Sequence, residues 1–374
     1  MYRLGVFLLS VLCLTVLVQI LAVVAWHDYR QNGDVSPVRA LSNFIPGPFE
    51  VKDSDVEASG RPSIGPASLP EIRSELLYLI NSERVLAQVP PLNLGYNASA
   101  QQHTESMKQY GYRSHWDVHG LTPQMRYTLA GGTNRVRQNI AGPIGIPASD
   151  DSGITAWRTV IREMHQGFMA GSAERANVLD PWHRNVSLGL SCNEAQCWVV
   201  QQFETDHLEF INLPTIYGTK LQMSGQFREG LELEALAVWF HPHSRRLSLG
   251  QLDATYRYGI GQKPATFVRP PASTEDYYAE SLVSYEWGTG IDPYTLDAGL
   301  SRSSAPPLSV EVAHSAAVPW TTADRWSQDD SRFTVEADLS EIISFHGTGV
   351  YTVQIWGRIG ADTVPLTNYS VFLP

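Results

Sequence analysis

The residues of this chain that could do chemistry gather in one short stretch. Ser114 and His115 are adjacent, and Asp117 and His119 follow at once. Histidine and carboxylate side chains bind zinc or transfer protons, and a serine next to a histidine suggests a nucleophile. A catalytic triad is defined by geometry rather than by adjacency, however. Ser114 is therefore interpreted as a loop hydroxyl that bonds to the main chain.

The composition of the whole chain excludes some classes of function. The 374 residues include 27 Lys and Arg against 38 Asp and Glu, a formal net charge of −11. We find no basic stripe with interleaved aromatic residues, so the sequence predicts no nucleic-acid partner. An apolar content of 43% is enough for folded cores, and the length predicts two domains with accessory segments.

The N-terminal segment differs from the rest of the chain. Arg3 precedes a mostly apolar run from Leu4 to Ala25, which is about as long as a membrane is thick. The run is longer than the core of a cleavable signal, and no clean small-x-small site follows it. We expect residues 1–30 to be an uncleaved transmembrane signal anchor with the folded domains outside the cytoplasm; a cleaved signal and secretion is the alternative. Residues 31–67, rich in Pro, Ser, Gly and Asp, are expected to be a flexible linker.

Helical periodicity dominates the stretch after the linker. His103 falls on the apolar face of one expected helix. It is interpreted as a hydrogen-bonded core histidine, with a cleft residue as the alternative. The expected helices begin with a capping box at Ser68, at Asn97, at Thr122-Pro123 and near Asp150, and a short one ends at Asp180-Pro181.

Two extended stretches follow the last of these helices. Apolar and β-branched residues alternate on either side of SCNEAQC, which predicts a β-hairpin. Cys192 and Cys197 would lie at its neck, close enough across the ladder to form a disulfide. A disulfide persists in an exported protein, in agreement with the expected signal anchor.

The stretch from Gly167 to Glu204 resembles the end of the CAP superfamily domain (cysteine-rich secretory proteins, antigen 5 and pathogenesis-related proteins) in its short bacterial form. The family pattern is roughly W-M-x-S-P-G-H-R-A-N-I-L-x-P, then V-G-x-G. It stands here as FMAGSAERANVLDP, then VSLG. LINSERVLAQVPPLNL, QQHTESMKQYGYRSH and RQNIAG resemble earlier parts of the same domain. The resemblance covers roughly residues 69–206 and implies an α-β-α sandwich with a cleft.

The resemblance also implies which residues line that cleft. In many members two His and two acidic residues do so, and some members bind a divalent metal there. His115 matches the first His, Gln138 stands in the place of the Glu of G-E-N, and Glu174 stands in the place of the second His. The remaining acidic position falls at Gly171. With one neighbour from the histidine loop, the implied cleft residues are His115, Gln138, Asn139, Glu174 and Asp117.

These substitutions change the chemistry expected of the cleft. His115 and Glu174 supply two metal ligands, and the Gln138 amide is a poor third. A glutamine also cannot act as a general base. The sequence therefore predicts no bound metal and no other cofactor. We expect His115, Gln138 and Glu174 to converge in one polar pocket, where an ionised Glu174 would raise the pKa of His115.

From residue 208 onward, short alternating stretches separated by Gly predict an antiparallel β-sandwich. Residues 208–270 and 278–374 are either two small β-modules or halves of one, with a proline-rich break between them. His241 and His243 lack a further ligand nearby in the sequence and are interpreted as part of a surface turn.

The expected fold class is α+β: a transmembrane helix, an α-β-α sandwich over residues 68–207 and a β-sandwich over residues 208–374. Two functions of different classes fit this organisation. The first is a membrane-tethered extracytoplasmic binding module whose cleft holds a peptide, a lipid or a cell-surface glycan fragment. The second is a peptidase-like hydrolase that uses His115 and Glu174. The altered polarity of the cleft favours the binding module over an enzyme.

Overall fold

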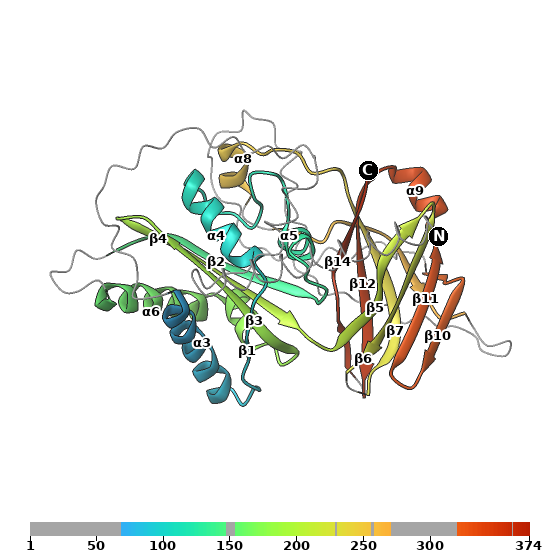
Figure 1. Ribbon diagram of the computed structural model, residues 1–374, viewed down its shortest axis with the longest axis horizontal. Helices are drawn as coiled ribbons and strands as arrows, with labels where there is room; N and C mark the ends of the chain where they lie inside the picture. Colours follow the sequence, from blue (N-terminus) through green and yellow to red (C-terminus); the bar gives the residue numbers. More distant parts are fainter. Residues whose placement is uncertain (1–68, 147–153, 229, 256–257, 271–319, 361) are drawn as a thin grey trace, which may run out of the picture. The chain divides into compact units, whose positions relative to one another are not determined.

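The computed structural model describes residues 69–146, 154–228, 230–255, 258–270, 320–360 and 362–374 (Figure 1). The expected signal anchor, the linker and the capping box at Ser68 lie outside these ranges. Among the described residues, no helix is both long enough and apolar enough to cross a membrane.

We call the described part of residues 69–207 the α/β lobe. Its sheet has the strand order β1-β3-β4-β2. The helices α4 and α5 cover one face of this sheet, and α3, α6 and α7 cover the other (Figure 1). This arrangement is the α-β-α layering that the family resemblance implied. The elements are α3 (Leu69–Leu86), β1 (Asn93–Gly95), α4 (Ser99–Tyr110), α5 (Pro123–Leu129), β2 (Val136–Gly145), α6 (Ile154–Ala170), α7 (Ser172–Leu179), β3 (His183–Cys192) and β4 (Gln196–Thr205).

The helix α3 packs through residues at helical spacing. Ile72, Leu76 and Ile80 are buried together with Ile161 and Met164 of α6. Apolar residues three and four positions apart share one side of a helix, so this stripe faces the sheet.

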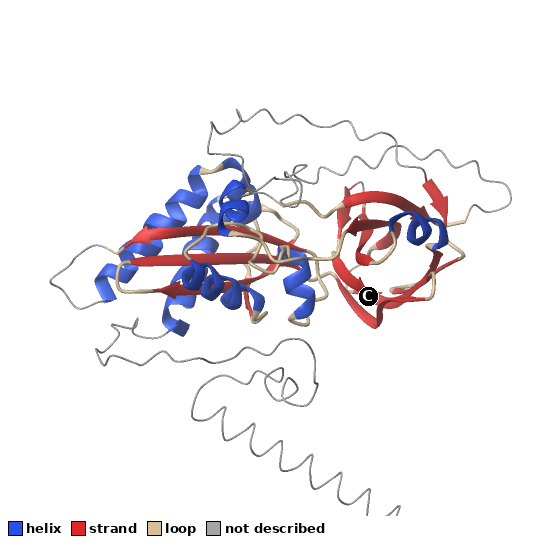
Figure 2. Cartoon of the chain, turned by 90° about the horizontal axis from the view of Figure 1, so that it is seen from above, coloured by secondary structure: helices blue, strands red, loops and turns tan. Residues whose placement is uncertain are grey.

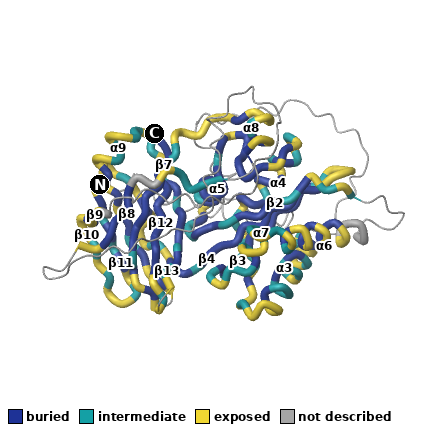
Figure 3. The backbone as a smooth tube through the Cα atoms, turned by 180° about the vertical axis from the view of Figure 1, so that it is seen from behind, coloured by how far each residue is buried: buried dark blue, intermediate teal, exposed yellow. Residues whose placement is uncertain are grey.

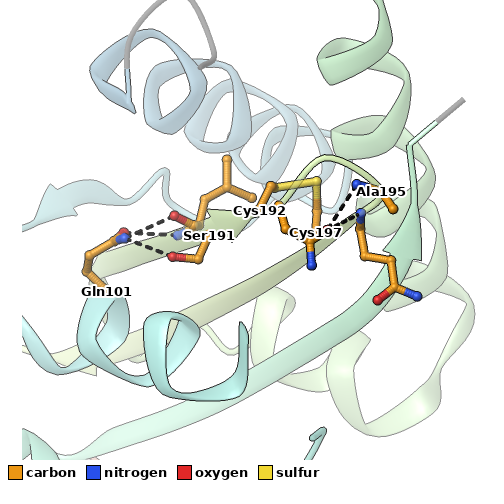
Figure 4. The surroundings of a disulfide bond; sticks show 8 residues. Gln101, Ser191, Cys192, Ala195 and Cys197 are labelled. Atoms are coloured by element: carbon orange, nitrogen blue, oxygen red, sulfur yellow. Dashed lines mark hydrogen bonds between the residues drawn. A yellow bond between two sulfur atoms is a disulfide. The ribbon is translucent and has the colours of Figure 1, made fainter. Parts of the chain in front are cut away.

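The hairpin predicted from the sequence is confirmed. Cys192 pairs with Cys197 in the β3–β4 ladder and the two form a disulfide, with their Cα atoms 4.1 Å apart. Figure 4 shows this disulfide at the neck of the hairpin, with Gln101 beside Ser191. The Gln101 amide donates to the main-chain oxygen of Leu190 and accepts from its N–H, each at 3.0 Å. The short strand β1 does not extend as far as Leu190 along the edge of β3. The Gln101 side chain thus satisfies the main-chain hydrogen-bonding groups of β3 there.

Gly189 explains how closely α4 approaches the sheet. A Cβ atom at this position would lie 2.2 Å from the main-chain oxygen of Ala100, a distance no side chain tolerates. Gly189 is the second glycine of the V-G-x-G pattern. The pattern therefore has a packing role in this chain.

We call the described part of residues 208–374 the β lobe. One sheet has the order β10-β11-β6-β5 and the other β13-β12-β7-β8-β9, with β14 beside β12. Figure 2 shows these strands curving around a common interior. The strands are β5 (Leu208–Tyr217), β6 (Lys220–Phe227), β7 (Glu232–His241), β8 (Gln262–Val268), β9 (Trp320–Thr322), β10 (Arg325–Asp329), β11 (Arg332–Asp338), β12 (Gly349–Ile359), β13 (Asp362–Pro365) and β14 (Tyr369–Leu373); the helices are α8 (Leu249–Ala254) and α9 (Ser340–His346).

The strand pairing relates the two halves of the β lobe. Strand β6 pairs with β11, and β7 pairs with β12. Residues 208–268 and 320–373 therefore contribute to the same two sheets and share one apolar core. The pairing is antiparallel as expected, except that β8 and the short strand β9 run parallel.

Hydrogen bonds join the β lobe to the start of β2. The Asn368 side chain accepts from the main-chain N–H of Val136 and donates to its oxygen, each at 3.1 Å. The main-chain oxygen of Leu366 accepts from the Thr205 hydroxyl at 2.8 Å and from the Arg135 N–H at 2.9 Å. Figure 3 shows β4 of the α/β lobe and β12 of the β lobe as mostly buried. These bonds hold in place the strand that carries Gln138.

Candidate functional site

The side chains of Gln138 and Asn139 lie on opposite faces of the sheet, because successive residues of a strand alternate. The Gln138 Oε1 accepts a hydrogen bond from Arg126 Nη2 of α5 at 3.2 Å. The Asn139 Nδ2 donates to the main-chain oxygen of Glu174 on α7 at 3.0 Å. We call the first side the α4/α5 face and the second the α3/α6/α7 face.

His115 lies on the α4/α5 face. Its side chain hydrogen-bonds to Gln138, and its main-chain oxygen accepts from Arg126 Nη2 at 2.9 Å. The ring packs against Tyr258 with 5.0 Å between centroids. Burial, with Arg126 and Arg113 nearby, lowers the pKa of His115 to about 3. The imidazole is therefore neutral at physiological pH.

Glu174 does not join this group. Its main-chain oxygen contacts the α3/α6/α7 face through Asn139, and its carboxylate lies against Gly171 at the start of α7. The expectation that Glu174 converges with His115 and Gln138 is therefore wrong, because consecutive strand residues send their contacts to opposite faces. The expected rise in the pKa of His115 is also wrong, since burial and the nearby cationic Arg126 and Arg113 lower that pKa.

Arg126 is the organising residue that the sequence analysis missed. Its guanidinium donates to the main-chain oxygens of Leu121 and His115 as well as to Gln138. It lies 4.0 Å from the carboxylate of Asp117. The only sequence signal was one arginine inside the short helix PQMRYTL, directly after the histidine stretch.

Asp117 shapes the loop that holds His115. Its Oδ1 accepts from the main-chain N–H of His119 at 2.9 Å and of Leu121 at 2.8 Å. Together with the Arg126 contact, these bonds occupy the carboxylate. Asp117 thus fixes the loop.

His103 and Ser114 have the structural roles expected of them. The His103 Nε2 bonds to the main-chain oxygen of Ser114 at 2.9 Å, so the core interpretation is confirmed. Burial lowers the pKa of His103 well below its ordinary value. The Ser114 hydroxyl donates to the main-chain oxygen of Thr255 at 2.6 Å and accepts from the Trp116 N–H at 3.2 Å.

The partner of Ser114 belongs to the connection between β7 and β8. We call residues 242–255 and 258–261, the described part of that connection with α8, the cover. Leu247 and Leu252 of the cover are buried in one apolar cluster with Met107 of α4 and with Trp116. The Leu247 N–H donates to the main-chain oxygen of Val118 at 3.0 Å. The cover therefore lies over the His115 loop, by which we mean residues 111–122 between α4 and α5. The sequence analysis did not anticipate this contact.

The histidine pair at the end of β7 divides between two environments. His241 packs edge-on against Trp116, with 5.8 Å between ring centroids. His243 is exposed and bonds to the Thr348 hydroxyl at 2.7 Å. The surface-turn interpretation therefore holds for His243, whereas His241 packs against the His115 loop.

No group of three or more His, Cys, Asp or Glu side chains in the described ranges is arranged to hold a metal ion. The donors around His115 are an amide and a guanidinium, and a guanidinium repels a cation. The residues present at this site do not fit a divalent metal.

A shallow, open hollow of about 510 Å³ lies elsewhere, between α5, β5 and β14. Its lining carries no charged side chain, and it includes the half-exposed Leu129 and Phe372. The lining residues are Thr128, Leu129, Pro214, Thr215, Ile216 and the C-terminal run 369–374.

No protein-family model matches the chain, and no curated protein matches its sequence. Among solved structures, the chain is similar to an extracellular protein containing an SCP domain from Bacillus anthracis str. Ames, with 20% identity over 38% of this chain and a TM-score of 0.28. The match spans 45% of that protein, which is less than half its length. An outer surface protein from Borrelia burgdorferi is similar over 37% of this chain and 96% of its own, with 11% identity and a TM-score of 0.30.

Proposed function

We propose that this protein is an extracytoplasmic binding module of CAP type, anchored in the membrane through its N-terminal segment, and that it has no hydrolytic centre. The observation that carries the proposal is the environment of His115. A hydrolase of the kind considered needs an accessible histidine with a carboxylate partner. Here the imidazole is buried, and its neighbours are an amide and a guanidinium.

The location outside the cytoplasm is supported by two independent features. The Cys192–Cys197 disulfide is typical of an oxidising compartment. The apolar run after Arg3 has the length of a membrane span. We infer two domains, residues 68–207 and 208–374, of which the first binds a peptide, a lipid or a cell-surface glycan fragment.

The test of the binding-module proposal uses the full-length protein in detergent and a matched His115→Ala variant. Zinc content and peptidase activity are measured with and without a chelator. We expect no stoichiometric zinc and no activity that depends on His115. Zinc or chelator-sensitive activity that disappears in the variant would make the protein a hydrolase.

Cell fractionation tests the membrane anchor separately. The full-length protein is expected in the membrane fraction, and deletion of residues 1–30 is expected to release it. Recovery of a secreted protein that begins near Trp26 would show that the segment is a cleaved signal.

A further inference from the structure

The two sheets of the β lobe do not join where β5 lies beside β14. Within the described residues, β5 pairs only with β6, and β14 pairs only with β12. Phe210 of β5 and Tyr369 of β14 pack together, with 6.1 Å between ring centroids, so the two strands are neighbours. The open hollow of about 510 Å³ lies between them, with α5 on its third side (Figure 1). Both strands are therefore sheet edges that border an open space.

Strand β14 turns main-chain groups toward this hollow. In an antiparallel ladder, the N–H and C=O of one residue point to the partner strand, and those of the next residue point away. The Ser370 N–H donates to Thr128 Oγ1 of α5 at 3.1 Å, so it points away from β12. Phe372 lies two residues further along and has the same orientation. Its N–H and C=O therefore have no ladder partner in the described part of the chain.

Strand β5 has a similar residue on the opposite side of the hollow. Tyr217 pairs with Lys220 around a two-residue turn that begins with Gly218, at a φ of 61°. The closing pair of such a hairpin exchanges both of its main-chain hydrogen bonds. Ile216, one residue earlier, therefore points its N–H and C=O away from β6. Ile216 also lines the hollow, so main-chain donors and acceptors border it from two sides.

These groups and the lining restrict what the hollow can hold. Main-chain groups at an open strand edge are satisfied by the main chain of an added strand, whereas a lipid chain offers them no hydrogen bond. The lining carries no charged side chain, so a charged segment would lose its hydration without an ion-pair partner. The half-exposed Leu129 and Phe372 instead offer apolar contacts. An extended peptide with uncharged side chains meets all of these conditions.

We propose that the hollow binds an extended, uncharged peptide segment of a partner protein, which adds to β14 as a strand. The inference goes beyond the proposed function, because this site borders the second domain and uses none of the residues around His115. Pairing is expected along β14 rather than along β5. Strand β5 shifts register on both sides of Asn212, and Pro214 has no N–H; such features protect an edge strand from pairing. The open edge of β14 is short, so binding is expected to depend on the apolar contacts as well.

The probe is a fluorescently labelled heptapeptide of alternating threonine and valine with blocked ends. Full-length protein in lipid nanodiscs is titrated, so that no detergent competes for the hollow, and binding is followed by fluorescence anisotropy. We expect saturable binding. The fully N-methylated peptide keeps the side chains but has no N–H to donate, so it should bind at least about tenfold more weakly. Equal binding of the two peptides, or no saturable binding of the first, would overturn strand addition.

A substitution at Phe372 tests the location of the site. Phe372→Asp places a carboxylate in the uncharged lining, so the peptide should bind at least about tenfold more weakly. Phe345→Asp is the matched control, since Phe345 is an exposed phenylalanine of α9 that does not line the hollow. This control should bind the peptide as the wild type does. Equal weakening by both substitutions would overturn the assignment to the hollow.

Hydrogen exchange locates the bound strand without any variant. Saturating peptide should slow exchange of the Phe372 amide at least about tenfold, whereas the Val371 amide, which faces Tyr351 in the β12–β14 ladder, should keep its rate. Unchanged exchange at Phe372 would overturn the proposed pairing. Wild-type dimers in analytical ultracentrifugation that dissociate in Phe372→Asp would make a second copy the occupant and would also overturn it. Either result would leave the binding-module proposal standing, since zinc content and hydrolysis decide that proposal.

Discussion

The two faces of the α/β sheet are made by alternate residues of the same strands, and they differ in how many polar side chains they bury. On the α3/α6/α7 face, β3 and β4 contribute mainly apolar side chains to a buried cluster, including Val186, Leu188, Val199 and Phe203. On the α4/α5 face, alternate positions bury the polar Ser187, Gln202 and Glu204. The apolar Ile140, Trp198 and Val200 are buried on the same face. Both faces are buried, so the difference is not one of exposure to water.

This contrast indicates what each face contributes. Apolar burial stabilises a fold, whereas buried polar groups must be matched one by one and are retained where they serve recognition. We therefore expect substitutions on the α3/α6/α7 face to lower stability more than substitutions on the α4/α5 face. Substitutions at adjacent residues of one strand can separate these two contributions.

The largest expected effect is at Phe203 on the apolar face. Phe203→Ala should lower the free energy of unfolding by about 3–5 kcal/mol, because it removes a fully buried ring and leaves a cavity. Gln202→Ala, one residue away, should cost only about 1 kcal/mol, since it loses the bond from Ser99. Urea unfolding of both variants measures the difference. Equal costs would show that the two faces do not differ in their contribution to stability.

The disulfide holds together the hairpin that contributes to both faces. It closes a short loop, so its reduction should lower the free energy of unfolding by about 2 kcal/mol. Unfolding of oxidised and reduced wild-type protein gives the value, with a Cys192→Ala/Cys197→Ala double variant as the control for the reductant. Thiol labelling that found two free cysteines in the unreduced protein would contradict the disulfide itself.

Sequence reasoning was reliable where one local rule decides the outcome. Helical spacing located α3, the Asp180-Pro181 stop ended α7, and strand alternation around SCNEAQC gave the hairpin and its disulfide. It failed where residues distant in the sequence meet. The resemblance grouped Glu174 with Gln138, but the main-chain oxygen of Glu174 bonds to Asn139, whose side chain faces the other way.

The cover and Arg126 could not be predicted for the same reason. The contacts of the cover run from Leu247 to Val118 and from Thr255 to Ser114, over more than a hundred residues of chain. Such contacts depend on how the β lobe folds, and no spacing in the sequence reports them. Arg126 makes its contacts with main-chain oxygens of a loop, which leave no trace in side-chain pattern.

The buried carboxylate of Glu204 gives the α4/α5 face a pH dependence of its own. Glu204 accepts from the Ser187 hydroxyl at 2.6 Å and from the Tyr127 hydroxyl at 2.8 Å, yet burial raises its pKa above the ordinary 4.5. The folded protein therefore holds this proton more tightly than the unfolded chain does. The resulting stability is present below pH 4.5 and is lost as the pH rises through the folded-state pKa.

A Glu204→Gln variant removes that titration. At pH 4 it should differ from the wild type by no more than about 1 kcal/mol, the value of one rearranged hydrogen bond. As the pH rises toward 7, the variant should gain stability relative to the wild type. Urea unfolding across this range measures the difference, and a constant offset between the two proteins would mean that Glu204 does not titrate on folding.

The smallest expected effect is at Gln138, and it sharpens the comparison most. Gln138→Leu removes a buried amide whose Nε2 has no partner and fills the space with a side chain of similar size. Removal of the unpartnered Nε2 is set against the lost bonds from Arg126 and from the buried His115 ring, so the free energy of unfolding should fall by about 1 kcal/mol. Asn139→Leu is the matched control on the other face: Asn139 bonds to Glu174, Gln201 and Asn177, so its loss should cost about 2–3 kcal/mol. If the Gln138 substitution proves the costlier of the two, then the α4/α5 face is polar for the sake of stability, and the case for a binding role loses its physical basis.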